Sequence, residues 1–202
     1  MDSEPTVFIV EDDTGMRNAV SLLLRSAGFA VRSYPSAETF LTELDSSKPI
    51  CLLADVRLPK MDGIALFRHL VGLGVEPAVV VITGHGDIPM AVAALKEGVV
   101  DFIEKPFDPG VLLESVRDAW RRAEANQERK AVAADIEARR STLSPRELDV
   151  LKLLTQGHLN KVIAAKLGMS TRTAEHHRAR IMEKMGARSL SQLVKMQLGI
   201  LS

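Results

Sequence analysis

The chain has 202 residues, enough for one large domain or two small ones, and its composition is that of an ordinary soluble globular protein. Its single cysteine, Cys51, excludes an internal disulfide, and its apolar runs are too short to span a bilayer. Because the first residues lack the basic and apolar segments of a signal peptide, we expect a cytoplasmic protein that does not contact a membrane.

The formal net charge is zero, but it is the sum of two unlike halves. Residues 1–120 carry 18 Asp and Glu against 10 Lys and Arg, whereas residues 121–202 carry 8 against 16. Such an asymmetry is typical of a basic module that binds polyanions, joined to a module with another task. Two folded domains with unrelated isoelectric points would produce it as well.

In chain order, the first 120 residues predict five strands that alternate with helices. Short apolar or β-branched runs place the strands at residues 6–10, 30–34, 50–55, 77–83 and 100–104. Amphipathic spacing and glycine stops predict the helices between them, and Asp108-Pro109 has the cap-then-proline pattern of a helix start. This alternation predicts an α/β fold with a doubly wound, five-stranded parallel sheet and helices on both faces.

Polar side chains follow the carboxyl ends of these strands: Glu11, Asp12, Asp55, Thr83 and Lys105. A single Asp in such a place is usually a cap or turn residue, and an acidic pair can be a solvated loop. Because the carboxyl ends of parallel strands meet at one edge, where open α/β sheets bind ligands, we expect these five side chains to form one site.

The residue types suit phosphoryl transfer to a carboxylate. Glu11, Asp12 and Asp55 are hard oxygen ligands, so a bound Mg²⁺ would offset their mutual repulsion. Asp55 would then be the nucleophile and form an acyl phosphate. The Thr83 hydroxyl and the Lys105 ammonium would bind the phosphoryl oxygens.

Residues 5–120 resemble the receiver domain of two-component response regulators. The segments Ile82–Val92 and Asp101–Phe107 are especially similar to the FixJ type. The resemblance implies that Asp55 is the phosphoacceptor and that the main-chain carbonyl of Arg57 joins Glu11 and Asp12 in binding Mg²⁺.

The same resemblance implies a cis peptide bond at Lys105-Pro106 and a switch pair formed by Thr83 and Phe102. Glu11 departs from the family, which more often has Asp there, and its longer side chain would reach the metal through water. We expect His85 to be a partly exposed loop residue and Asp87 to cap the fourth helix.

Residues 121–141 are expected to be a helical linker. No Gly or Pro occurs from Val111 to Arg140, and the segment is rich in good helix formers with few large apolar residues. It would either prolong the fifth helix as one continuous rod, which we favour, or serve as a partly helical tether.

Residues 142–202 predict an all-α domain of four helices. Ser144-Pro145-Arg146-Glu147 has the pattern of a capping box with proline at the first helical position. The second and third helices, at about residues 160–167 and 171–185, are separated by a short turn that contains Gly168, as in a helix-turn-helix. The domain carries 10 Lys and Arg against 4 Asp and Glu, a balance that favours binding to DNA phosphates.

Residues 143–198 resemble the LuxR-type helix-turn-helix of the FixJ and NarL group. The resemblance rests on Leu143–Glu147, Asn160-Lys161, Arg172–Glu175 and His177. It implies a DNA-binding face on the third helix, opposite a core face. The residues implied to contact bases are Glu175, His176 and Ala179. Those implied to contact phosphates are Lys161, Thr173, Arg178 and Lys184. Two further residues of the same polar face are Arg172 and Arg180.

Taken together, these features predict a phosphorylation-dependent transcription regulator and not an enzyme in its own right, although slow self-dephosphorylation is compatible with it. A partner histidine kinase would phosphorylate Asp55, and the resulting homodimer would bind double-stranded DNA. One alternative is a phosphatase, but Arg57 stands where such an enzyme would carry a second Asp. Another is a receiver whose helical half binds protein; salt-sensitive duplex binding would distinguish it.

Overall fold

The structure, a computed structural model, describes residues 5–84 and 88–200. The predictions for His85 and Asp87 lie outside the described residues. By its internal contacts the chain divides into two compact units, Met1–Gln127 and Glu128–Ser202, which are described separately below.

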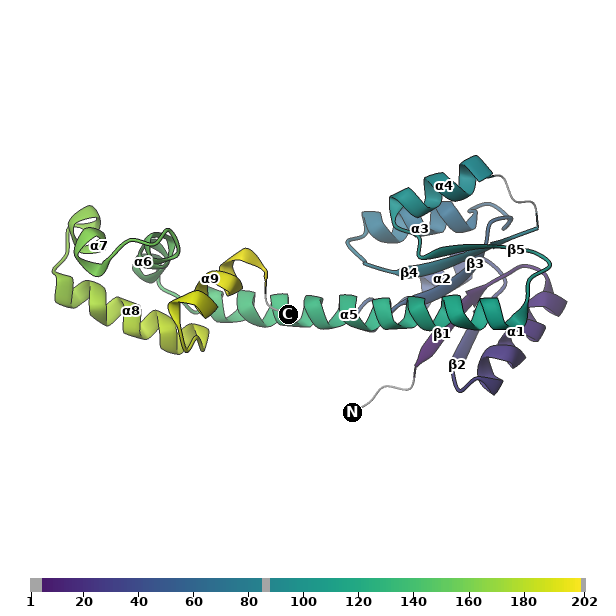
Figure 1. Cartoon of the computed structure of the whole chain (residues 1–202), viewed down its shortest axis with the longest axis horizontal. Helices are drawn as coiled ribbons and strands as arrows, with labels where there is room; N and C mark the ends of the chain where they lie inside the picture. The colour runs from purple at the N-terminus through teal and green to yellow at the C-terminus, as the bar shows by residue number, and fades with distance from the viewer. Residues whose placement is uncertain (1–4, 85–87, 201–202) are drawn as a thin grey trace. The chain divides into compact units, whose positions relative to one another are not determined.

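The first unit is built on a five-stranded, all-parallel sheet with the strand order β2-β1-β3-β4-β5 (Figure 1). The predicted doubly wound α/β fold is therefore confirmed. The order reverses beside β1, and such a switch point leaves a crevice at the carboxyl ends of β1 and β3. The strands are β1 (Thr6–Val10), β2 (Ala30–Tyr34), β3 (Cys51–Asp55), β4 (Ala78–Thr83) and β5 (Asp101–Glu104).

Helices cover both faces of this sheet, as a parallel sheet requires. One face packs against α1 (Thr14–Ser26) and the first turns of α5 (Pro109–Ser141). The other packs against α2 (Ala37–Thr42), α3 (Gly63–Gly72) and α4 (Ile88–Glu97). Every residue of the central strands β3 and β4 is buried, which explains their continuous apolar sequences.

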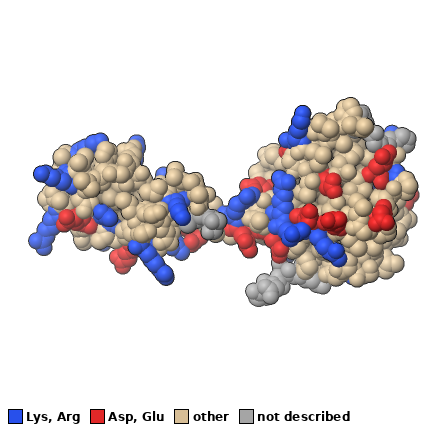
Figure 2. Space-filling model, viewed as in Figure 1, with Lys and Arg blue, Asp and Glu red and all other residues tan. Residues whose placement is uncertain are grey.

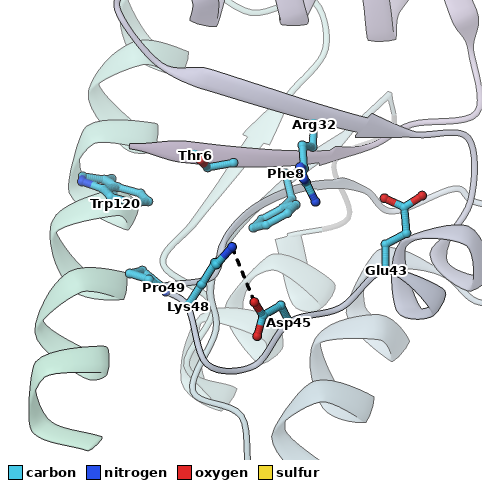
Figure 3. Close-up of a pocket in the computed structure, with 8 residues that line it drawn as sticks. All are labelled: Thr6, Phe8, Arg32, Glu43, Asp45, Lys48, Pro49 and Trp120. Carbon is cyan, nitrogen blue, oxygen red and sulfur yellow. Dashed lines mark ion pairs between the residues drawn. The ribbon is translucent and has the colours of Figure 1, made fainter. Parts of the chain in front are cut away.

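The first unit extends beyond the predicted boundary at residue 120 because α5 remains in contact with it. Ala123 is buried in the core, and the Asn126 side-chain amide donates to the Glu76 carbonyl at 2.9 Å. Trp120 lines a hollow of about 160 Å³ beside Pro49 (Figure 3). The predicted linker thus begins inside this unit, and α5 continues as one helix to Ser141.

The second unit packs the end of α5 and four further helices around one core. These helices are α6 (Pro145–Thr155), α7 (Asn160–Leu167), α8 (Thr171–Met185) and α9 (Leu190–Leu198). The predicted capping box is present at Ser144 and Glu147, and Gly168 ends α7 in the left-handed conformation (φ 63°). No helix in the described ranges, 5–84 and 88–200, has the length and apolar character needed to cross a membrane.

Candidate functional site

Strand register brings the predicted polar residues to one edge of the sheet. Val10 pairs with Ala54, so Glu11 leaves β1 beside Asp55 at the end of β3. Thr83 ends β4 opposite Glu104, and Lys105 follows directly. The site therefore forms because the parallel strands end at nearly the same level.

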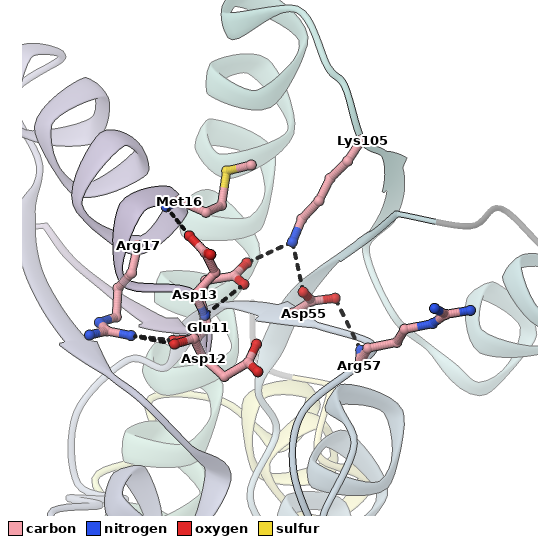
Figure 4. Close-up of polar contacts among 8 residues, drawn as sticks. All are labelled: Glu11, Asp12, Asp13, Met16, Arg17, Asp55, Arg57 and Lys105. Atoms are coloured by element: carbon pink, nitrogen blue, oxygen red, sulfur yellow. Dashed lines mark hydrogen bonds and ion pairs between the residues drawn. The ribbon is translucent and has the colours of Figure 1, made fainter.

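Asp55 and Lys105 form the centre of this site (Figure 4). The Lys105 ammonium donates to Asp55 Oδ2 at 2.7 Å and to Glu11 Oε2 at 2.8 Å. The other oxygen, Asp55 Oδ1, accepts the Arg57 main-chain N–H at 3.0 Å. Each carboxylate oxygen of Asp55 thus has a donor, which offsets the cost of burying the charge. The Arg57 side chain points away from the acidic cluster (Figure 4).

Three carboxylates at this edge have the arrangement of a cation site. Glu11, Asp12 and Asp55 each offer an oxygen, and these oxygens lie within 4.8 Å of one another. Glu11 and Asp55 are buried, whereas Asp12 is exposed. Burial raises the pKa of Glu11 above its usual value, and the hydrogen bond from Lys105 offsets only part of that rise. Crowded oxygens of this kind suit a hard divalent cation such as Mg²⁺.

The pKa of Lys105 reflects two opposing effects. Burial alone would lower the pKa of its ammonium, but the hydrogen bonds to Asp55 and Glu11 and the negative charges of these carboxylates together outweigh burial, so the pKa lies above its usual value. Lys105 is therefore charged at neutral pH and neutralises part of the acidic cluster. The peptide bond between Lys105 and Pro106 is cis, as predicted.

Two residues that sequence reasoning did not single out support the site. Gly63, the first residue of α3, lies against the end of β3, where an added Cβ would sit 2.3 Å from the Asp55 carbonyl oxygen. The Arg17 guanidinium donates to the carbonyl oxygens of Glu11 at 2.7 Å and Asp12 at 3.2 Å, which holds the turn after β1 (Figure 4). Both contacts depend on how the turn after a strand folds back on it, so no periodic pattern in the sequence reveals them.

The remaining receiver residues lie beside this centre. Thr83 is 1% exposed at the end of β4, and Phe102 on β5 is half-buried against the core. Cys51 is buried, and burial raises the pKa of its thiol to about 12, so it is an inert core residue.

The helical unit presents a polar face on α8. Ala174, Ile181 and Met185 are buried and form its core face. Two of the residues predicted to contact DNA, Arg178 and Lys184, are partly buried, and all the others are exposed. The exposed ones are Lys161 on α7 and Arg172, Thr173, Glu175, His176, Ala179 and Arg180 on α8.

Lys184, which we predicted to contact DNA phosphates, makes two bonds inside the domain. Its ammonium donates to Glu147 Oε2 at 2.7 Å and to the Thr142 carbonyl at 2.9 Å. Glu147 is 2% exposed, and its Oε2 also accepts the Ser144 main-chain N–H at 2.8 Å. These bonds, first that from Lys184, lower the pKa of Glu147 to about 2. Lys184 therefore balances a buried carboxylate inside the domain, a role hidden in the sequence because Glu147 is far from it along the chain.

Comparisons with known proteins match both units. The family described as "Response regulator receiver domain" matches residues 7–117, and the family described as "Bacterial regulatory proteins, luxR family" matches residues 141–197. The chain is 45% identical to the transcriptional regulatory protein FixJ of Rhizobium meliloti (strain 1021), over 96% of this chain and 95% of that protein. It is a LuxR-type response regulator.

Further relatives of this response regulator share its full length. FixJ of Bradyrhizobium diazoefficiens is 42% identical over 97% of this chain and 96% of its own. The solved structure of the response regulator StyR has a TM-score of 0.82 at 38% identity, covering 97% of this chain and 99% of that one. A full-length FixJ structure from B. japonicum has a TM-score of 0.56 at 41% identity, with 96% of each chain covered. The chain is thus a transcriptional regulator of the two-component type.

Proposed function

We propose that phosphorylation of Asp55 switches this response regulator to a DNA-binding dimer. The observation that carries the proposal is the contact of the Lys105 ammonium with Asp55 Oδ2 at 2.7 Å, beside a cluster of oxygens suited to Mg²⁺. A carboxylate held between a cation and a metal site is arranged to receive a dianionic phosphoryl group.

The phosphoryl group would come from a phosphohistidine of a partner kinase. A carboxylate oxygen of Asp55 attacks phosphorus, the P–N bond breaks, and an acyl phosphate forms while the histidine nitrogen recovers its electron pair. Mg²⁺, when bound by Glu11, Asp12, Asp55 and the Arg57 carbonyl, supplies neutralising charge at the phosphoryl oxygens. Lys105 keeps its contact by donating to a phosphoryl oxygen, and later attack by water would slowly reset the switch.

The signal would spread through Thr83 and Phe102. When the Thr83 hydroxyl turns to donate to the phosphoryl group, it leaves space beside β5, and Phe102, now half-buried, has an adjacent core to enter. This movement would reshape the surface formed by α4, β5 and the start of α5.

That surface is the one we propose to dimerise. Among the described residues of α4, only Ala94 is buried, whereas large apolar side chains along the helix are exposed, with Ile88 at 77%. Val111 on α5 is also exposed. Exposed apolar side chains on one surface favour a protein partner, here a second copy of the chain. The exposed set is Ile88, Met90, Val92, Leu95 and Val111.

DNA binding would use the polar face of α8. The side chains of Glu175, His176 and Ala179 would face bases, while Lys161, Thr173 and Arg178 would contact phosphates, with Arg172 and Arg180 at the same face. Figure 2 shows Lys and Arg side chains projecting from this unit, at the left of the view, in accord with a polyanionic partner. Lys184 stays a predicted phosphate contact, with its ammonium also donating to Glu147.

The first experiment compares wild type, Asp55→Asn and the exposed control Asp45→Asn, each with and without an acyl-phosphate donor and Mg²⁺. We expect the donor to produce a dimer by light scattering, and duplex binding at least tenfold tighter, in wild type and Asp45→Asn only. The affinity should fall steeply with added salt, as phosphate contacts require. Equal mass and affinity in all samples would refute the switch.

The phosphatase alternative has a separate outcome in the same samples. It predicts continuous release of inorganic phosphate from a small phosphoester, in large excess over protein, and no salt-sensitive duplex binding. We expect incorporation that approaches one phosphoryl group per chain and stops.

A further inference from the structure

The end of the linker helix α5 contacts the end of α8, the helix proposed to bind DNA. We call this contact, made by Arg139 with Met185 and by Lys184 with Thr142, the joint. It takes no part in the switch described above. Both partners lie within the second unit, Glu128–Ser202. The Arg139 guanidinium on α5 donates through Nη1 to the Met185 carbonyl at 3.1 Å. Met185 is the last residue of α8, where helical carbonyls lack intrahelical partners and the helix dipole is negative. An arginine there is favourably placed both as a donor and as a charge.

Gly186 leaves the space that this guanidinium occupies. Gly186 ends α8 with φ 66°, and an added Cβ would lie 2.2 Å from Arg139 Nη1 and 3.4 Å from its Cζ. The guanidinium therefore rests directly on the glycine. Asp135, one turn earlier on α5, accepts from Arg139 Nη2 at 2.9 Å and fixes the direction of the side chain.

A second bond crosses the same joint in the opposite direction. Lys184 on α8 donates to the carbonyl of Thr142, directly after α5, at 2.9 Å. Ile136 on α5 packs against the core cluster of the unit, to which Met185 of α8 also belongs. One hydrogen bond donated by α5, one donated by α8 and an apolar contact thus hold the ends of the two helices together, so we expect them to move as one.

We infer that Arg139 is a positioning residue that couples the linker helix to the DNA-reading helix. The inference rests on the proposed function, in which two chains pair and place two copies of α8 on adjacent half-sites. A stiff joint lowers the conformational entropy lost when both half-sites are bound, and it restricts the half-site spacings that the dimer accepts. A loose joint would leave each α8 able to read its half-site but would weaken binding to the pair.

The test uses full-length Arg139→Ala with Arg140→Ala as the matched control. Arg140 is the next residue on the same helix, and its guanidinium contacts only Glu137 among the bonds described, at 3.4 Å within α5. The probes are duplexes with the half-site selected by wild type, present once or paired at a series of spacings. Each is titrated after treatment with an acyl-phosphate donor and Mg²⁺.

We expect Arg139→Ala to lose at least fivefold in affinity for the best paired site and to discriminate less between spacings. Its affinity for the single half-site should stay within twofold of wild type, and Arg140→Ala should match wild type throughout. Equal spacing profiles for Arg139→Ala and wild type would overturn the inference. An equal loss on single and paired sites would also overturn it, because Arg139 would then only support the shape of α8. If wild type itself fails to dimerise with the donor, the proposed switch fails, and this inference with it.

Gly186→Ala gives an independent check. The added methyl group should displace the guanidinium without removing it, so this variant should also lose spacing discrimination. Once Arg139 is alanine, the methyl group no longer meets the guanidinium, and only the cost of its positive φ remains. The two substitutions should therefore be clearly non-additive in paired-site affinity. Additive losses would show that the glycine and the arginine act separately, and would contradict the joint.

Discussion

At the scale of single residues, the position of Asp55 depends on a glycine that touches its main chain. Gly63 starts α3 directly against the end of β3, so α3 can approach the carbonyl of Asp55 only without a side chain at that position. The nearest atom is backbone and belongs to a buried strand, so it cannot move aside cheaply.

Gly63→Ala should therefore destabilise the receiver by about 1–3 kcal/mol through overpacking. It should also slow phosphoryl incorporation, because the end of β3 has to shift. Gly72→Ala is the matched control, since it lies in the same helix with nothing within 4 Å of its Cβ, and alanine there should stabilise by up to about 1 kcal/mol. Denaturant unfolding followed by Trp120 fluorescence measures both, and an unchanged Gly63→Ala would show that β3 and α3 can separate freely.

At the scale of secondary structure elements, α6 and α8 are tied by Glu147 and Lys184. The carboxylate accepts the Ser144 N–H that completes the capping box and the Lys184 ammonium at 2.7 Å. Its pKa is lowered from 4.5 to about 2. A carboxyl whose pKa is lower in the folded state contributes stability above its unfolded pKa, and this stability is lost as the pH falls toward the folded value.

The helical unit should accordingly lose stability between about pH 4.5 and pH 2. In this range Glu147 is protonated in the unfolded chain but still ionised in the folded one, so protons favour unfolding. Amide hydrogen exchange in α6 and α8 of the full chain, measured across this range, reports the loss separately from the receiver.

In Glu147→Gln the unit should be less stable at neutral pH, by roughly 1–3 kcal/mol for the lost charged hydrogen bonds. Its stability should also vary less below pH 4.5, and a slope as steep as that of wild type would assign the acid sensitivity to other groups.

At the scale of the whole molecule, α5 runs across the boundary between the two units. It is one uninterrupted helix from Pro109 to Ser141 and belongs to the core of the first unit at its start and of the second at its end. If phosphorylation of one unit controls DNA binding by the other through paired chains, the helix has to remain intact between them.

Ala134→Pro tests this requirement, because proline removes one helical hydrogen bond, clashes with the preceding turn and costs about 3 kcal/mol in a helix interior. Ala134 is exposed, so the substitution spares both cores, and Ala134→Ser is the matched control. We expect Ala134→Pro to dimerise with the phosphoryl donor, as seen by light scattering, and yet to lose most of its preference for paired over single half-sites. A preserved preference would mean that the linker acts as a tether and that its stiffness is irrelevant.

The strands, most helices and the composition of the receiver site could be read from local sequence, because apolar periodicity, caps and glycine stops are properties of neighbouring residues. Once β1, β3, β4 and β5 are known to be parallel, Glu11, Asp55, Thr83 and Lys105 have to meet at one edge. Three contacts could not be predicted in this way: that of Gly63 with Asp55, the ion pair of Lys184 with Glu147, and the packing of the Arg139 guanidinium against Gly186. Each depends on how closely two secondary structure elements approach, and that distance is decided only when the helices pack in three dimensions.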